Sequence, residues 1–149
     1  MNQHRRSFIR KAVAVAVGLA VAPLRVFAAR PTEAFEKESK DDVLQSMFGK
    51  TATESGDISI KAPDIAENGA VVPITVKFKI PGASAVGIIV ENNPSPLAAS
   101  FELTPDSGGL VSTRVKMGKT SPVHAVIEAN GKLYMASKEV KVTIGGCGG

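Results

Sequence analysis

From Asp57 to Ile144, apolar and polar residues alternate in short runs. This alternation predicts β-strands, because successive side chains of a strand point to opposite faces of a sheet. Clusters of glycine, proline, asparagine, aspartate and serine separate the runs, and these residues favour turns. The pattern predicts seven strands: Asp57–Ala62, Ala70–Ile80, Ala85–Glu91, Ala98–Leu103, Leu110–Met117, Val123–Ala129 and Lys132–Ile144.

The last two predicted strands are joined by Asn130-Gly131. This dipeptide favours the two positive φ angles of a type I′ turn and therefore predicts a β-hairpin. Seven short strands with such spacing favour an immunoglobulin-like antiparallel β-sandwich. The cysteine pair and the tryptophan that mark antibody domains are absent, since the chain has one cysteine and no tryptophan.

A short helical lead-in is expected before the strands. Ser39 is suited to cap the start of a helix, and Gly49 is suited to its end. Four apolar residues between them recur at helical spacing: Val43, Leu44, Met47 and Phe48. A further helical turn is expected to start at Pro31-Thr32-Glu33, with Phe35 as its apolar anchor, and Thr51–Gly56 is expected to be a linker.

The N-terminus has the features of an export signal. Arg5 and Arg6 precede an apolar run from Ala12 to Ala22, and Val26-Phe27-Ala28 provides a plausible cleavage point. We therefore expect a twin-arginine signal peptide over residues 1–28 and a mature protein in the periplasm, outside the membrane. The apolar run is about half of the roughly 20 residues that cross a bilayer. An ordinary secretory signal that contains two arginines is the alternative, and it also leads to export.

Removal of the signal peptide changes the charge of the protein. The chain has 18 Lys and Arg against 14 Asp and Glu, and five of the basic residues precede the expected cleavage site. The mature chain then carries 13 basic and 14 acidic residues, a net charge of −1. Since the basic excess belongs to the signal peptide, we do not expect binding to nucleic acid. The division expected is 1–28 signal peptide, 29–56 helical lead-in and linker, 57–144 β-sandwich and 145–149 C-terminal arm.

The C-terminal arm carries the only cysteine, Cys147, between two pairs of glycines: Gly145, Gly146, Gly148 and Gly149. Glycine adopts both signs of φ and has no Cβ, so these residues predict a flexible and narrow segment. From Ile144 to Cys147 an extended chain spans about 10 Å. A single cysteine cannot form a disulfide within its own chain, and an odd cysteine in an exported protein indicates a reactive or intermolecularly bonded thiol. We expect Cys147 to be a thiol that enters the clefts of other proteins.

Three other functions are consistent with parts of the pattern. Cys147 could pair with His124, the only histidine after the signal peptide, as nucleophile and base of an enzyme, although a histidine in an alternating strand is more often buried or half-solvated. The terminal Gly148-Gly149 could serve as a thiocarboxylate carrier, but this requires activation by ATP, which an exported protein does not meet. Cys147 could also join two subunits through a disulfide in an exported structural protein.

Metal and cofactor sites are not expected. One histidine and one cysteine in the mature chain are too few for a zinc, copper or iron–sulfur site. Neither a phosphate-binding loop nor a dinucleotide motif is present. Cysteine is well suited to reversible loading with sulfur, because an S–S bond that it forms can later be broken by another nucleophile.

Four stretches together resemble the SoxY family, the sulfur-carrier subunits of periplasmic thiosulfate oxidation. They are the twin-arginine leader, Ile65–Ile74 (IAENGAVVPI), Asn93–Phe101 (NPSPLAASF) and the terminal pentapeptide GGCGG. The resemblance implies that Cys147 holds the sulfur substrate covalently and that the chain itself catalyses no step. It also implies a heterodimer with SoxZ, a second β-sandwich subunit. The enzymes implied are a cytochrome that adds thiosulfate, a hydrolase that releases sulfate and a dehydrogenase that oxidises the remaining sulfane sulfur.

Overall fold

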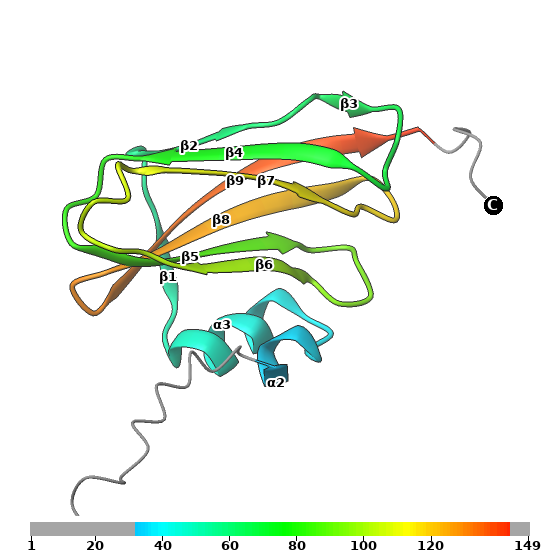
Figure 1. Ribbon diagram of the computed structural model, residues 1–149. Helices are drawn as coiled ribbons and strands as arrows, with labels where there is room; N and C mark the ends of the chain where they lie inside the picture. The colour runs from blue at the N-terminus through cyan, green and yellow to red at the C-terminus, as the bar shows by residue number, and fades with distance from the viewer. Residues whose placement is uncertain (1–31, 144–149) are drawn as a thin grey trace, which may run out of the picture. The chain divides into compact units, whose positions relative to one another are not determined.

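The structure is a computed structural model, and it describes residues 32–143. Two sheets pack face to face in these residues, and two short helices cover the outer face of the larger sheet (Figure 1). The helices are α2 (Thr32–Phe35) and α3 (Lys40–Phe48). The strands, in chain order, are β1 (Ala52–Glu54), β2 (Ile58–Lys61), β3 (Ile65–Ala66), β4 (Val72–Phe78), β5 (Ala83–Val90), β6 (Leu97–Glu102), β7 (Leu110–Val115), β8 (Ser121–Ala129) and β9 (Lys132–Val142).

The larger sheet has the strand order β1-β9-β8-β5-β6, and β3 also pairs with β9. The smaller sheet has the order β2-β4-β7. All seven predicted strands are present, each within a few residues of its expected bounds, and the mainly β fold of two layers is confirmed. The hairpin between β8 and β9 turns at Asn130 and Gly131, whose φ angles are +50° and +73°, as expected for a type I′ turn.

Two short strands were not predicted. β1 lies within the expected linker Thr51–Gly56, and β3 lies in the connection between β2 and β4. Both pair parallel to the same edge of β9, β1 beside Leu133–Met135 and β3 beside Lys141–Val142. The prediction of a linker over Thr51–Gly56 was wrong at β1, because the sequence of β1 has no alternating pattern that marks a strand. The sequence of β3 has no such pattern either. Each forms by adding to the open edge of a long strand.

Two apolar clusters hold the layers together. The main core lies between the sheets and contains side chains such as Ile74, Val86, Ile88 and Ile127, all fully buried. The second lies between the larger sheet and the helices, where Val43 and Leu44 of α3 meet apolar side chains of the sheet: Ile89, Leu97, Val126 and Leu133. Strand β8 therefore contributes to both clusters, because its alternate side chains point to opposite faces.

The helical lead-in begins and ends as its sequence predicts. The Oγ of Ser39 accepts a hydrogen bond from the backbone N–H of Asp42 at 3.1 Å, and Gly49 ends α3 with φ +62°. The Oγ of Ser95 donates a hydrogen bond to the carbonyl of Phe35, which ties α2 to the loop between β5 and β6. None of the helices in the described residues is long and apolar enough to span a membrane.

Candidate functional site

The candidate site is the end of the sandwich at which β9 stops and residues 144–149 begin. Figure 1 shows that three loops lie at this same end: those from β3 to β4, from β5 to β6 and from β7 to β8. Cys147 and its neighbours Gly145, Gly146, Gly148 and Gly149 lie outside the described residues, as do Arg5 and Arg6 of the expected signal. Their roles stay predictions, and the structure describes the base from which the C-terminal arm starts.

The last residues of β9 alternate as predicted. Val140 is fully buried and Val142 half-buried, while Glu139, Lys141 and Thr143 are exposed. Ile144, expected to continue this pattern, is outside the described residues. The buried valines anchor the strand in the main core up to the residue before Thr143.

Three hydrogen bonds donated by backbone N–H groups fix the end of β9 on both sides. Lys141 and Thr143 donate from their N–H groups to the carbonyls of Asp64 and Ala66, at 3.0 and 3.2 Å. Between them, the N–H of Val142 donates to the Oγ1 of Thr120 at 3.0 Å. Because Thr120 lies in the loop between β7 and β8, the base of the arm is held by β3 on one edge and by this loop on the other.

The loop from β3 to β4 packs against the loop from β7 to β8. Met117 donates from its N–H to the carbonyl of Gly69 at 2.6 Å. A Cβ atom at Gly69 would also lie 2.9 Å from the Cγ1 of Val142. Gly69 therefore sits against both Met117 and the end of β9, in a space that no larger residue fits without movement.

Asn93 connects the third loop to the same structure. Its side-chain amide donates to the carbonyl of Lys116 at 2.7 Å and accepts from the N–H of Gly118 at 3.0 Å. A cavity of about 510 Å³ lies between these two loops. Its lining residues are Asn93, Pro94, Ser95, Leu97, Ala98, Lys116 and Gly118.

The two internal stretches that carried the family resemblance thus meet at one place. Ile65–Ile74 supplies β3, Gly69 and the start of β4, and Asn93–Phe101 supplies the Asn93 contacts and β6. The sequence pattern did not mark Thr120 or Met117 as part of this end. Only the turn residues around Gly118 marked their loop, and nothing in the local pattern showed that it contacts β9.

Exposed charges of both signs lie at this end, with Glu67 in the loop from β3 to β4 and lysines in the loop from β7 to β8. Lys116 and Lys119 are exposed, and no ion pair joins either to a carboxylate within the described residues. Lys138 is engaged, since its Nζ lies 3.0 Å from the carboxylate of Asp64 and donates to the carbonyl of Ala62 at 2.7 Å. This pair holds the segment that leads into β3.

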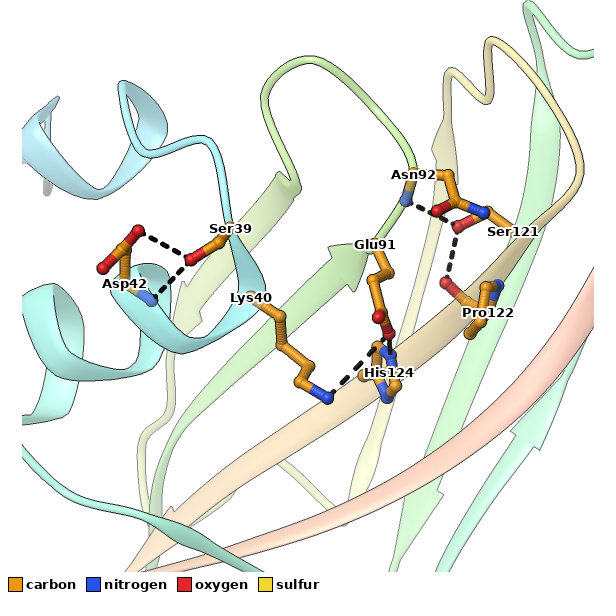
Figure 2. Close-up of polar contacts among 8 residues, drawn as sticks. All are labelled: Ser39, Lys40, Asp42, Glu91, Asn92, Ser121, Pro122 and His124. Carbon is orange, nitrogen blue, oxygen red and sulfur yellow. Dashed lines mark hydrogen bonds and ion pairs between the residues drawn. The ribbon is translucent and has the colours of Figure 1, made fainter.

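His124, the alternative catalytic residue, lies under the helical lead-in (Figure 2). It is 5% exposed, which confirms the expectation of a buried or half-solvated histidine. Its Nε2 lies 2.6 Å from the carboxylate of Glu91, which in turn lies 3.9 Å from the Nζ of Lys40 at the start of α3. Because an ionised carboxylate only accepts hydrogen bonds, the contact assigns a proton to Nε2.

The other ring nitrogen of His124, Nδ1, is buried and has no hydrogen-bond partner among the described residues. The ring is thus held from one side only, by Glu91. In the part of the chain between 32 and 143, no group of three or more histidines, cysteines and carboxylates is placed to bind a metal ion. His124 fits a structural contact between β8 and the lead-in.

Comparison with known proteins gives a consistent result. The family model described as "Sulfur oxidation protein SoxY" matches residues 44–147. Among solved structures, the sulfur carrier protein SoxY from Chlorobium limicola f thiosulfatophilum is 50% identical, with a TM-score of 0.64, over 70% of this chain and 96% of that chain. A superoxide reductase (neelaredoxin) from Ignicoccus hospitalis is 19% identical with a TM-score of 0.48, over 58% of this chain and 80% of that chain. A search among curated proteins gives no significant match.

Proposed function

The chain belongs to the SoxY family of sulfur oxidation proteins, and from this premise we propose that it carries sulfur covalently on Cys147 during thiosulfate oxidation. One observation carries the proposal: the family match extends to residue 147, the position of the only cysteine in the sequence. The relative that is 50% identical is itself a sulfur carrier protein. A carrier needs one thiol that can be loaded with sulfur, and the sequence has one cysteine.

The proposed chemistry needs only the thiol from this chain. In loading, the thiol of Cys147 loses a proton, an S–S bond forms to the outer sulfur of thiosulfate, and two electrons pass to the cytochrome. In unloading, water attacks the sulfonate sulfur, sulfate leaves, and a persulfide remains on Cys147. The dehydrogenase then oxidises that sulfane sulfur to a sulfonate, with water supplying the oxygen atoms and an electron acceptor of the dehydrogenase taking the electrons. Hydrolysis of this sulfonate releases a second sulfate and restores the thiol of Cys147. Each step breaks or makes a bond to sulfur on the arm, which is the chemistry that cysteine performs reversibly.

The arrangement of the described residues supports this division of labour. The end of β9 is fixed by hydrogen bonds to Asp64, Ala66 and Thr120, so the chain leaves the sandwich from a defined point. From Thr143, an extended chain reaches Cys147 within about 14 Å. His124 is buried beneath α3 beside Glu91, in a position that suits packing rather than proton transfer. Catalysis is therefore assigned to the partner enzymes, and the chain itself is proposed to be non-catalytic.

The proposed setting is the periplasm, reached through the twin-arginine pathway with Arg5 and Arg6 as the signal. The proposed permanent partner is a SoxZ-like β-sandwich subunit. We propose that three enzymes bind the arm in turn: the cytochrome, the sulfate-releasing hydrolase and the sulfane dehydrogenase. Gly145, Gly146, Gly148 and Gly149 are proposed to keep the thiol accessible, because residues without a Cβ keep the chain narrow.

The proposal is tested with Cys147→Ser in cells that depend on thiosulfate. We expect thiosulfate consumption to stop while the variant folds and accumulates normally. A second variant, Cys147→Ser combined with Ser112→Cys, places a thiol on the exposed face of β7 and should not restore consumption. Consumption that continues with Cys147→Ser, or that returns with Ser112→Cys, would refute a carrier role for residue 147.

A further inference from the structure

The solvent-facing side of the smaller sheet is basic and contains no acid. Alternation along β2, β4 and β7 exposes Lys61, Lys77 and Arg114 on this side. The sequences of the three strands, ISIK, VPITVKF and LVSTRV, contain no aspartate or glutamate. The helices cover the other sheet, so no described element covers this face (Figure 1). We call it the basic face, made of Lys61, Lys77 and Arg114 with the residues between them.

The cations of the basic face are not neutralised within the described residues. The ion pairs found among residues 32–143 involve Lys40, Lys50, His124 and Lys138. None of these pairs involves a cation of the basic face. Lys61 stands opposite Thr75 and Lys77 opposite Ser59, so the two lysines are diagonal neighbours on paired strands. The Cα atoms of diagonal neighbours lie about 7–8 Å apart, so both lysines add their charge to one part of the surface. An anionic partner would be attracted to this part of the surface.

The rest of the basic face is mostly small and polar, although Pro73 and the half-exposed Leu110 also face outward. Ser59, Thr75 and Ser112 lie between the cations, and the hydroxyls of Thr75 and Ser112 are 2.9 Å apart. Its outward residues include no aromatic side chain, which argues against stacking on single-stranded nucleic acid. A permanent subunit interface is expected to be more apolar than this. The composition fits a polar contact with a protein that binds and leaves.

Charge is unevenly distributed over the domain. The lead-in, from Thr32 to Asp42, contains five acidic residues and two lysines, whereas the basic face contains cations alone. The net charge expected for the mature chain, −1, does not reveal that acidic and basic residues lie on different parts of the domain. Such a separation orients an approaching protein and raises its association rate, and the effect weakens with salt.

The basic face also adjoins the base of the arm. β4 starts three residues after Gly69, and β7 ends two residues before Met117, which donates to the Gly69 carbonyl. Arg114 stands opposite Pro73, at this end of the face. A protein bound on the basic face would therefore lie near the end of β9, the last described part of the chain before the arm.

From these observations we propose that the basic face docks the acidic surface of an exchangeable enzyme that acts on the arm. The inference rests on the proposed carrier function, and it adds the place on the carrier where such an enzyme binds. Steering by opposite charge suits a carrier that several enzymes must bind and release. The contact would be small and weakened by salt, as transient interfaces are.

The test measures binding of the full mature chain carrying Cys147→Ser to three purified enzymes of the same system, the cytochrome, the hydrolase and the dehydrogenase. Adding Lys61→Gln and Lys77→Gln should raise the Kd for at least one enzyme about fivefold at about 10 mM salt, since exposed charge pairs contribute modestly. The difference should shrink at about 0.1 M salt, where the screening length falls from about 30 Å to about 10 Å. The matched control, Lys37→Gln with Lys132→Gln, removes the same charge elsewhere and should leave the Kd within about twofold of the parent.

Several outcomes would overturn the inference. One is an unchanged Kd in the Lys61→Gln, Lys77→Gln variant, and another is the absence of enzyme binding to the parent at low salt. Loss of binding to a SoxZ-like subunit would make the face a permanent interface instead. Binding to vesicles with anionic lipids or to a single-stranded oligonucleotide, lost in the same variant, would assign it to those ligands. Because Cys147 is replaced in every variant of this binding test, the results do not depend on sulfur loading. The proposed carrier function is refuted by a different result, the absence of a sulfur adduct on Cys147 in protein isolated from cells.

Discussion

Gly69 lies so close to the carbonyl oxygen of Met117 that a Cβ atom at position 69 would be 2.4 Å from it. Real Cβ atoms do not approach a backbone oxygen that closely, so Gly69→Ala must push the two loops apart. We expect the free energy of unfolding to fall by about 1–3 kcal/mol, the range for overpacking. Denaturant unfolding measures this change.

Gly56→Ala is the matched control, because a Cβ at Gly56 would have no heavy atom within 4 Å. Its stability should stay close to that of the parent. Hydrogen exchange adds a local readout, since Gly69→Ala should speed exchange at Val142 and Thr143 more than in the centre of β8. Equal stability of the two variants would contradict the described packing at the base of the arm.

Asn93→Ala removes two hydrogen bonds that join the loop after β5 to the loop after β7. We expect a loss of about 1–2 kcal/mol of unfolding free energy, since each bond contributes about 0.5–1.5 kcal/mol and water partly replaces it. Asn68→Ala is the comparison, because the amide oxygen of Asn68 accepts only the local bond from Ala70. A larger loss for Asn68→Ala than for Asn93→Ala would show that Asn93 does not tie the loops.

His124→Ala should destabilise the domain without affecting sulfur loading. The side chain is buried, and its removal leaves a cavity and breaks the contact with Glu91, for an expected loss of about 2–3 kcal/mol. The fraction of folded molecules that become loaded in a reconstituted assay should equal that of the parent. A stable variant that no longer loads would bring back the catalytic alternative in which His124 acts as a base.

The export route makes a separate prediction. Replacing both signal arginines, Arg5→Lys and Arg6→Lys, should leave the precursor in the cytoplasm, because the twin-arginine pathway reads the pair itself. An ordinary secretory signal requires only positive charge before its apolar run and would tolerate both lysines. Cell fractionation distinguishes the two routes, and normal export of the double-lysine variant would exclude the twin-arginine assignment.

The seven main strands could be predicted because their signals are local. Alternation fixes which side chains are buried, and turn residues such as Asn130-Gly131 mark the ends of the runs. Ser39 and Gly49 likewise bound α3 through contacts within a few residues. Each of these signals lies inside the element that it predicts.

What could not be predicted depends on contacts between distant residues. β1 and β3 exist only because β9 offers an open edge, and their own sequences show no strand pattern. Thr120 reaches Val142 across 22 positions, and Glu91 reaches His124 across 33. The residue on which the proposed function depends most, Cys147, was identified as a candidate reactive thiol from composition and position. Its role in holding sulfur came from the resemblance to the SoxY family, whose model matches as far as residue 147.

The most direct measurement is the intact mass of the mature protein isolated from cells that are oxidising thiosulfate, followed by peptide mapping. The account predicts molecules with added sulfur or sulfonate on the C-terminal peptide, with the addition lost after treatment with a reductant. Protein that carries an unmodified thiol throughout, or that is found only as a dimer linked through Cys147, would contradict it.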